Sequence, residues 1–137
     1  MRRLGVVAAA LLCALVAVPV VQAAPSTAFT GSWVSTDPVD GSTQHLYVMG
    51  GTSVQILYVD EYGTTCGLIG APTNVFTGIL TGRVSGNELD AWFKQGGCGP
   101  VIELAAANFF AWTFLYDPGT DTLYGALEDG PATWHRG

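Results

Sequence analysis

The sequence predicts an all-β domain, namely an eight-stranded antiparallel meander closed into a barrel, with one disulfide and a signal peptide before it. Short runs of β-branched and aromatic residues recur between clusters of Gly, Pro, Asp and Asn. No segment after the first 23 residues shows a helical apolar stripe flanked by caps. Most of the runs are joined by turn signals of hairpin length, which is typical of a meander.

Each predicted strand has alternating or continuous apolar character bounded by turn residues. Eight short strands in a meander commonly close into a barrel. A β-sandwich is the alternative, and it would need a crossing connection through 60–74 or 95–108. The predicted strands are Thr30–Ser35, Thr43–Met49, Ser53–Val59, Val75–Thr81, Glu88–Lys94, Phe109–Tyr116, Thr122–Leu127 and Ala132–Arg136.

The two ends of this meander are predicted to differ. Because strand direction alternates, one end receives the tight turns at Gly50-Gly51, Ser85–Asn87 and Asp117–Asp121, where Gly, Asn and Pro suit hairpins. The other end, called here the open end, receives the remaining connections. These are 36–42, 60–74, 95–108 and 128–131.

Residues 1–23 have the pattern of a secretory signal peptide, with Arg2 and Arg3, an apolar run from Leu4 to Val21, and small residues before Ala24. A membrane anchor is the alternative, but Pro19 and the lack of a basic stop-transfer run argue against it. We therefore expect an extracellular or periplasmic protein without a membrane anchor. Its N-terminal tail would be 24–29 and its barrel domain 30–137.

Removal of the leader leaves three basic residues against 11 acidic ones, a net charge near −8. Such a charge repels phosphate backbones and anionic lipid headgroups, so neither nucleic acid nor a membrane surface is an expected partner.

Cys66 and Cys98 remain after Cys13 leaves with the leader, and in an oxidising compartment we expect them to be bridged. Strand order places both at the open end, and closing a loop of this length contributes about 3–4 kcal/mol in the chain-entropy model. Two free thiols or half of a metal site are the alternatives. The chain has no C-x-x-C pair, and only His45 and His135 are available as imidazole ligands.

Two connections at the open end, 67–76 and 99–110, are nearly free of charge, with Glu103 as their single charged residue. They could form a lid for an apolar ligand or a contact patch for another protein. Alternatively, they fold inward as a plug, or Val101–Ala107 forms a short helix over the barrel end.

Aromatic residues supply the candidate ligand-binding set. Small residues at Gly78, Ala91 and Gly125 could leave room beside them, although an eight-stranded barrel is only just wide enough to be filled by its own side chains. Alternation along Glu88–Lys94 directs Phe93 inward and leaves Trp92 exposed. The candidate ligand-binding residues are Tyr58, Phe93, Trp112 and Phe114.

Acidic residues near the open end raise the question of catalysis, which would need Asp37, Asp60 and His45 to converge. Asp-Pro and Asp-Gly are first of all turn formers. Calcium at Asp37, Asp40 and Ser42 is a further alternative, but the spacing lacks the alternating ligands of an EF-hand. We expect no enzymatic activity, no metal and no cofactor.

The first and last predicted strands carry motifs of a known type of barrel. "TGSWVST" at the first strand and "TWHRG" at the last resemble the G-x-W signature and terminal arginine of calycins, the lipocalin and avidin type of barrel. The chain is also similar to uncharacterised small secreted bacterial domains. The calycin resemblance implies a barrel whose lumen or mouth binds a small apolar molecule. Strand order also predicts that Trp33 meets Arg136 at a structural seam where the barrel closes.

The sequence therefore favours a secreted, non-enzymatic binding module that takes a small apolar or amphipathic ligand at the open end. The alternative partner is an extracellular protein. The architecture resembles small periplasmic inhibitors of secreted metalloproteases, which place a free N-terminal tail before G-x-W, here Ala24–Phe29.

Overall fold

The computed structural model describes residues 27–68, 70, 73–99, 103–104, 111–127 and 130–137. The predicted signal peptide and the start of the predicted tail therefore lie outside the described residues. The elements are β1 (Gly31–Thr36), β2 (Thr43–Gly50), β3 (Ser53–Glu61), α1 (Thr64–Leu68), β4 (Val75–Ser85), β5 (Glu88–Cys98), β6 (Glu103–Leu104), β7 (Ala111–Asp117), β8 (Thr122–Leu127) and β9 (Gly130–Arg136).

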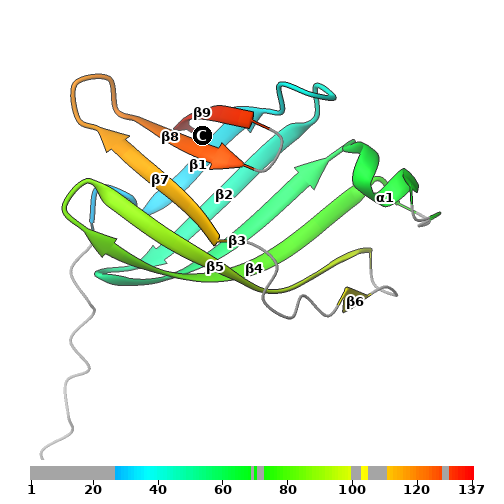
Figure 1. The fold of residues 1–137 in the computed structure, drawn as a ribbon, viewed down its shortest axis with the longest axis horizontal. Helices are drawn as coiled ribbons and strands as arrows, with labels where there is room; N and C mark the ends of the chain where they lie inside the picture. Colours follow the sequence, from blue (N-terminus) through cyan, green and yellow to red (C-terminus); the bar gives the residue numbers. More distant parts are fainter. Residues whose placement is uncertain (1–26, 69, 71–72, 100–102, 105–110, 128–129) are drawn as a thin grey trace, which may run out of the picture.

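The described strands form a closed antiparallel barrel of eight, with β6 added beside β5 (Figure 1). The order around the barrel is β4-β3-β2-β1-β9-β8-β7-β5, and pairing of β4 with β5 completes the circle. The all-β barrel prediction is confirmed, and the sandwich alternative is wrong.

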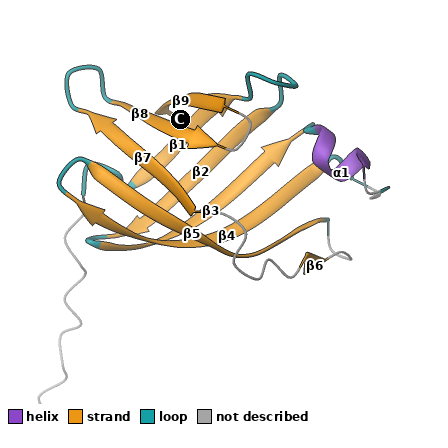
Figure 2. Cartoon of the chain, in the orientation of Figure 1, coloured by secondary structure: helices purple, strands orange, loops and turns teal. Residues whose placement is uncertain are grey.

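The two ends differ as the turn signals predicted. Figure 2 shows the tight turns β2–β3, β4–β5 and β7–β8 on one side and α1 on the other. Gly50 and Gly86 have positive φ values of 114° and 60° in two of these turns, conformations that favour glycine. The described part of the chain contains no helix long and apolar enough to cross a bilayer.

The prediction that the fifth strand ends at Lys94 is wrong, because β5 continues to Cys98. Ile79 pairs with Gln95 while Leu80 pairs with Phe93, so Lys94 is an extra residue in a β-bulge. The bulge turns both Lys94 and Gln95 outward and breaks the alternation. Because the alternation of inward and outward side chains stops at the bulge, the sequence pattern looks as if the strand ended there.

Other predicted strand limits move by one to four residues. β4 continues four residues past its predicted end at Thr81, and β3 continues two residues past Val59. The start predicted for the sixth strand, at Phe109, lies outside the described residues. The helix considered over Val101–Ala107 is wrong at Glu103 and Leu104, which pair as a strand with Gly97 and Gly96.

Helix α1 is an element that the sequence pattern did not predict, because five residues are too few for an apolar stripe. It carries Cys66, which is bonded to Cys98 at the end of β5. The two Cα atoms lie 5.5 Å apart, and both sulfurs are buried. The predicted disulfide is confirmed, and it ties α1 to the rim of the barrel at the open end.

The barrel closes where β1 meets β9, through only two residue pairs, Trp33 with Arg136 and Val34 with His135. The expected seam contact is present, with the Arg136 guanidinium carbon 3.8 Å from the ring centroid of fully buried Trp33. The guanidinium also donates to the carbonyls of Ala28 and Thr30, at 2.6 and 2.8 Å. One side chain thus binds the last strand to the segment before the first.

Phe29 is also part of this seam, because it is fully buried in the core and its carbonyl accepts a 2.8 Å hydrogen bond from the Trp33 indole. Phe29, the last residue of the expected tail over 24–29, therefore packs in the core of the barrel. An inhibitory tail that ends in a free Phe29 is not compatible with this packing.

Replacing Trp33 with alanine is expected to destabilise the fold by about 3–5 kcal/mol, because it empties a fully buried site at the seam. Chemical denaturation of the variant measures this. Trp92→Ala is the matched control, since the same side chain is removed from an exposed site and should cost much less. Equal losses in the two variants would contradict the seam.

Candidate functional site

The four aromatic residues predicted to bind a ligand lie together inside the barrel, packed against one another. Tyr58 meets Trp112 edge-on at 5.1 Å between ring centroids, and Trp112 meets Phe114 at 6.2 Å. Phe93 lies 6.4 Å from Trp112. Edge-to-face contacts at such distances stabilise aromatic pairs beyond the area they bury. The cluster extends through Phe76 and Trp134.

The small residues expected to leave room beside this cluster instead receive its rings. A Cβ on Gly78 or Gly96 would collide with the ring of Phe93, and a Cβ on Gly125 would lie 2.7 Å from the ring of Phe114. The glycines thus make space that the barrel's own phenylalanines occupy. At these positions the barrel's own rings fill the space, as the packed-core interpretation expects.

The cluster still reaches toward the open end. Phe114 is fully buried, whereas Tyr58, Phe93 and Trp112 keep exposures of 6–9 %. The pairing of β5 with β7 ends at Trp92 and Ala111. β5 runs on beyond that point toward β6 (Figure 1), and its inward-facing Phe93 follows the last described pair with β7.

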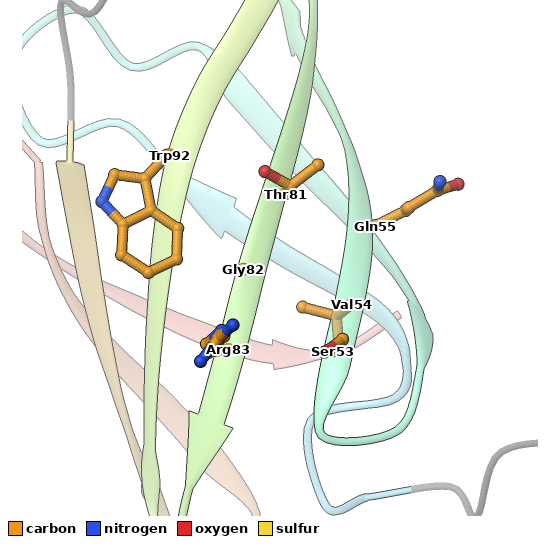
Figure 3. A pocket seen from close by; sticks show the side chains of 7 residues that line it. All are labelled: Ser53, Val54, Gln55, Thr81, Gly82, Arg83 and Trp92. Carbon is orange, nitrogen blue, oxygen red and sulfur yellow. The ribbon is translucent and has the colours of Figure 1, made fainter.

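The outer wall of β3, β4 and β5 bears a groove of about 400 Å³. Trp92 flanks it and is 42 % exposed, as the alternation along β5 predicted. Figure 3 shows Trp92 and Arg83 projecting from neighbouring strands, with Gln55 on the strand beyond. The lining residues are Ser53, Val54, Gln55, Thr81, Gly82, Arg83 and Trp92.

Arg83 lines this groove and forms no ion pair in the described part of the chain. Asp90 pairs with Arg83 across the strands, but its carboxylate accepts a 2.8 Å hydrogen bond from Thr113 on β7. The groove therefore combines one exposed indole with one guanidinium.

A buried polar layer lies at the open end, above the aromatic cluster. Gln44 on β2 is directly opposite Asp60 on β3, and both are buried. The Gln44 amide nitrogen donates to Asp37 at 2.8 Å. Asp40 accepts from the backbone N–H groups of Ser42 and Thr64, at 2.9 and 2.8 Å. The layer thus joins the β1–β2 connection to α1.

The charges of this layer act on one another. Burial raises the pKa of the Asp60 carboxyl, and the negative charges of Asp40 and Asp37 raise it further. The Ser42 hydroxyl offsets part of this rise, although its oxygen makes no hydrogen bond of normal geometry. Donation from Thr64 and Ser42 lowers the pKa of Asp40.

The convergence needed for catalysis is not found among the described residues. His45 lies on the outer side of β2, stacked on Tyr47 and 4.0 Å from Glu61. Asp37 and Asp60 are buried on the inner side. Within the described ranges, no three His, Cys, Asp or Glu side chains gather to hold a metal ion.

The turn-forming role expected for the aspartates is present. Asp37 accepts from the backbone N–H of Val39 at 2.7 Å, and Asp40 accepts from that of Ser42. Sequence reasoning missed the contribution of Gln44, because a polar residue between His45 and Thr43 gives no sign that it faces inward. The alternation of Leu46 and Val48 on the same strand was the signal that could have revealed it.

No protein-family model, no curated protein and no solved structure matches the chain.

Replacing Gly78 with alanine should destabilise the fold by about 1–3 kcal/mol, because the new methyl group and the Phe93 ring compete for one space. Adding Phe93→Leu should recover part of the loss, and urea denaturation of the single and double variants measures both effects. Gly67→Ala is the matched control, since a Cβ there meets open space. A lumen with free volume would absorb the methyl group of Gly78→Ala without loss.

Proposed function

We propose that this chain is an exported, non-enzymatic binding module of calycin type, which binds a small amphipathic ligand on its outer wall beside Trp92. The observation that carries the proposal is the exposed indole of Trp92 at a groove that is also lined by Arg83, a cation without an ion-pair partner in the described chain. An apolar platform and a positive charge on neighbouring strands of one groove favour a binding role.

The groove has the chemistry of a site for a flat ligand. The face of an indole is the negative side of its quadrupole, and it attracts the polarised C–H bonds on the apolar face of a sugar ring. Gln55, Thr81 and Ser53 supply side-chain donors and acceptors on the neighbouring strands. An apolar platform with polar groups beside it matches an amphipathic ring better than a purely apolar chain.

Arg83 favours a ligand that carries a carboxylate. Its guanidinium lines the groove and can bind a carboxylate through two parallel hydrogen bonds. Asp90, opposite Arg83 on β5, already accepts a hydrogen bond from Thr113. A sugar that carries a carboxylate fits both the indole platform and the guanidinium.

Export is supported by the leader pattern in residues 1–23 and by the disulfide, which persists in oxidising compartments. The calycin assignment is supported by the closed eight-stranded barrel and by the pairing of G-x-W with the terminal arginine. Calycins as a family place ligands in the lumen or mouth. In this chain the filled inner positions favour the outer wall.

The partial exposure of Phe93 and Trp112 favours the mouth as a second candidate site. Their side chains are 6 % and 9 % exposed, so a small apolar molecule could contact them there. This is the site that the sequence predicted.

Removing Trp92 should weaken binding of a galacturonic acid oligomer by about tenfold or more, because the platform is lost. Arg83→Gln should remove the preference for this oligomer over a neutral galactose oligomer of equal length. Isothermal titration calorimetry measures both effects.

Tyr124→Ala is the matched control, because Tyr124 is an exposed aromatic residue on β8, away from the groove. The affinity of the Tyr124→Ala variant for the galacturonic acid oligomer should equal that of the unmodified protein. Binding that survives Trp92→Ala, or no binding of the acidic oligomer at all, would reject the outer-wall site.

The second candidate makes a different prediction. If the mouth binds an apolar molecule, gently purified protein carries it into native mass spectrometry, and Trp112→Ala reduces the bound fraction while Trp92→Ala does not. Absence of any bound mass would exclude retention at the mouth.

A further inference from the structure

Three buried oxygen atoms in the polar layer at the open end lack hydrogen-bond partners. They are Gln44 Oε1, Asp60 Oδ1 and Ser42 Oγ, on side chains that are 1 %, 7 % and 3 % exposed, and the Ser42 hydroxyl lies near enough to Asp60 to lower the pKa of that carboxyl without a hydrogen bond of normal geometry. Buried polar groups without partners cost free energy and are rare in folded proteins. Three in one layer indicate a missing component, not a random defect.

The Gln44 amide cannot satisfy this need by turning over. Its nitrogen already donates to Asp37 at 2.8 Å, and a flipped amide would place its oxygen against that carboxylate. The amide oxygen therefore remains on the side away from Asp37. Gln44 and Asp60 are direct partners across β2 and β3, so two acceptors share this layer.

The layer also carries unbalanced charge. Asp37, Asp40 and Asp60 act on one another electrostatically, and no described lysine or arginine forms an ion pair with any of them. His45 on β2 faces the opposite side of the sheet and approaches Glu61 instead. A component that completes the layer must attract oxygen atoms and offset negative charge.

We propose that this layer binds a calcium ion, with Asp60, Gln44 and Ser42 as its side-chain ligands. Carboxylate, amide and hydroxyl oxygens are hard donors, which suit Ca²⁺ and not the ions that prefer histidine or cysteine. Ca²⁺ also tolerates irregular geometry, whereas Mg²⁺ requires a near-ideal octahedron. Asp37 and Asp40 contribute charge while their oxygens stay bonded to Gln44, Val39, Ser42 and Thr64.

Such an ion would order the open end of the barrel. Asp40 and Ser42 belong to the β1–β2 connection, and Asp60 is the residue before the end of β3. Thr64, whose backbone N–H donates to Asp40, begins α1. An ion at Asp60 would bind these segments to one another on the side of the barrel where the disulfide holds α1. One carboxylate ligand with two neutral ones implies weak binding, in the range of extracellular modules.

Adding CaCl₂ to EDTA-treated protein at neutral pH should raise the thermal unfolding midpoint saturably, by about several degrees at concentrations far above the dissociation constant. MgCl₂ at equal concentration should have a smaller effect. Asp60→Asn should abolish the rise, whereas Asp90→Asn, which removes an equal charge on β5, should retain it.

Each other outcome contradicts the proposal. Equal rises in Asp60→Asn and Asp90→Asn would place the ion elsewhere. An absent calcium effect together with a more stable Asp60→Asn protein would show that a proton on Asp60 completes the layer. An absent calcium effect without such stabilisation would indicate a buried water. If Asp60→Asn does not fold, Ser42→Ala decides, because the loss of one ligand should weaken the calcium effect severalfold and an unchanged effect would reject the site.

Discussion

Closure of the sheet between β1 and β9 is the constraint on which the rest of the structure depends. A meander with free first and last strands has two exposed edges, and here the two edges meet through only two residue pairs. Arg136 compensates for this short ladder, because its guanidinium lies over Trp33, donates to two carbonyls before β1 and pairs with Asp121. The Asp121 pair is exposed and contributes little by itself, so the contacts with Trp33 and the backbone dominate the seam.

Closure then determines what the interior can do. A barrel of eight strands encloses a space that side chains can fill, and here the rings of Phe93 and Phe114 occupy the positions over Gly78 and Gly125. The inward side chains stabilise the fold, whereas the groove with the exposed indole of Trp92 and the Arg83 side chain lies on the outer wall. The proposed ligand site is therefore separate from the packed interior. At the open end, the layer of Asp60, Gln44 and Ser42 is the exception to an apolar interior.

The sequence predicted those features that depend on period and order. The alternation of apolar and polar residues correctly predicted which side chains of β5 point inward, as far as Phe93. The order of the turns correctly predicted that Cys66 and Cys98 lie at the same end and that Trp33 contacts Arg136. It failed where local irregularity imitates a boundary, as at the bulge on Lys94. It also failed where three-dimensional packing decides. In the sequence, Gly78 and Gly125 suggest free space inside the barrel. Only the structure shows that the rings of Phe93 and Phe114 fill that space. The Gln44 side chain points inward because of its position in the strand register, which its polar character does not indicate.

Hydrogen exchange of the four indole N–H groups tests the central claim, which is that the closed barrel is filled by its own side chains. Each tryptophan gives a separate resonance, and the Trp33 N–H donates to a buried carbonyl while Trp112 and Trp134 lie in the core. The account predicts that Trp92 exchanges at once in D₂O while Trp33, Trp112 and Trp134 remain protected. A Trp112 indole that exchanges as fast as that of Trp92 would show that water reaches the lumen, and would contradict the account.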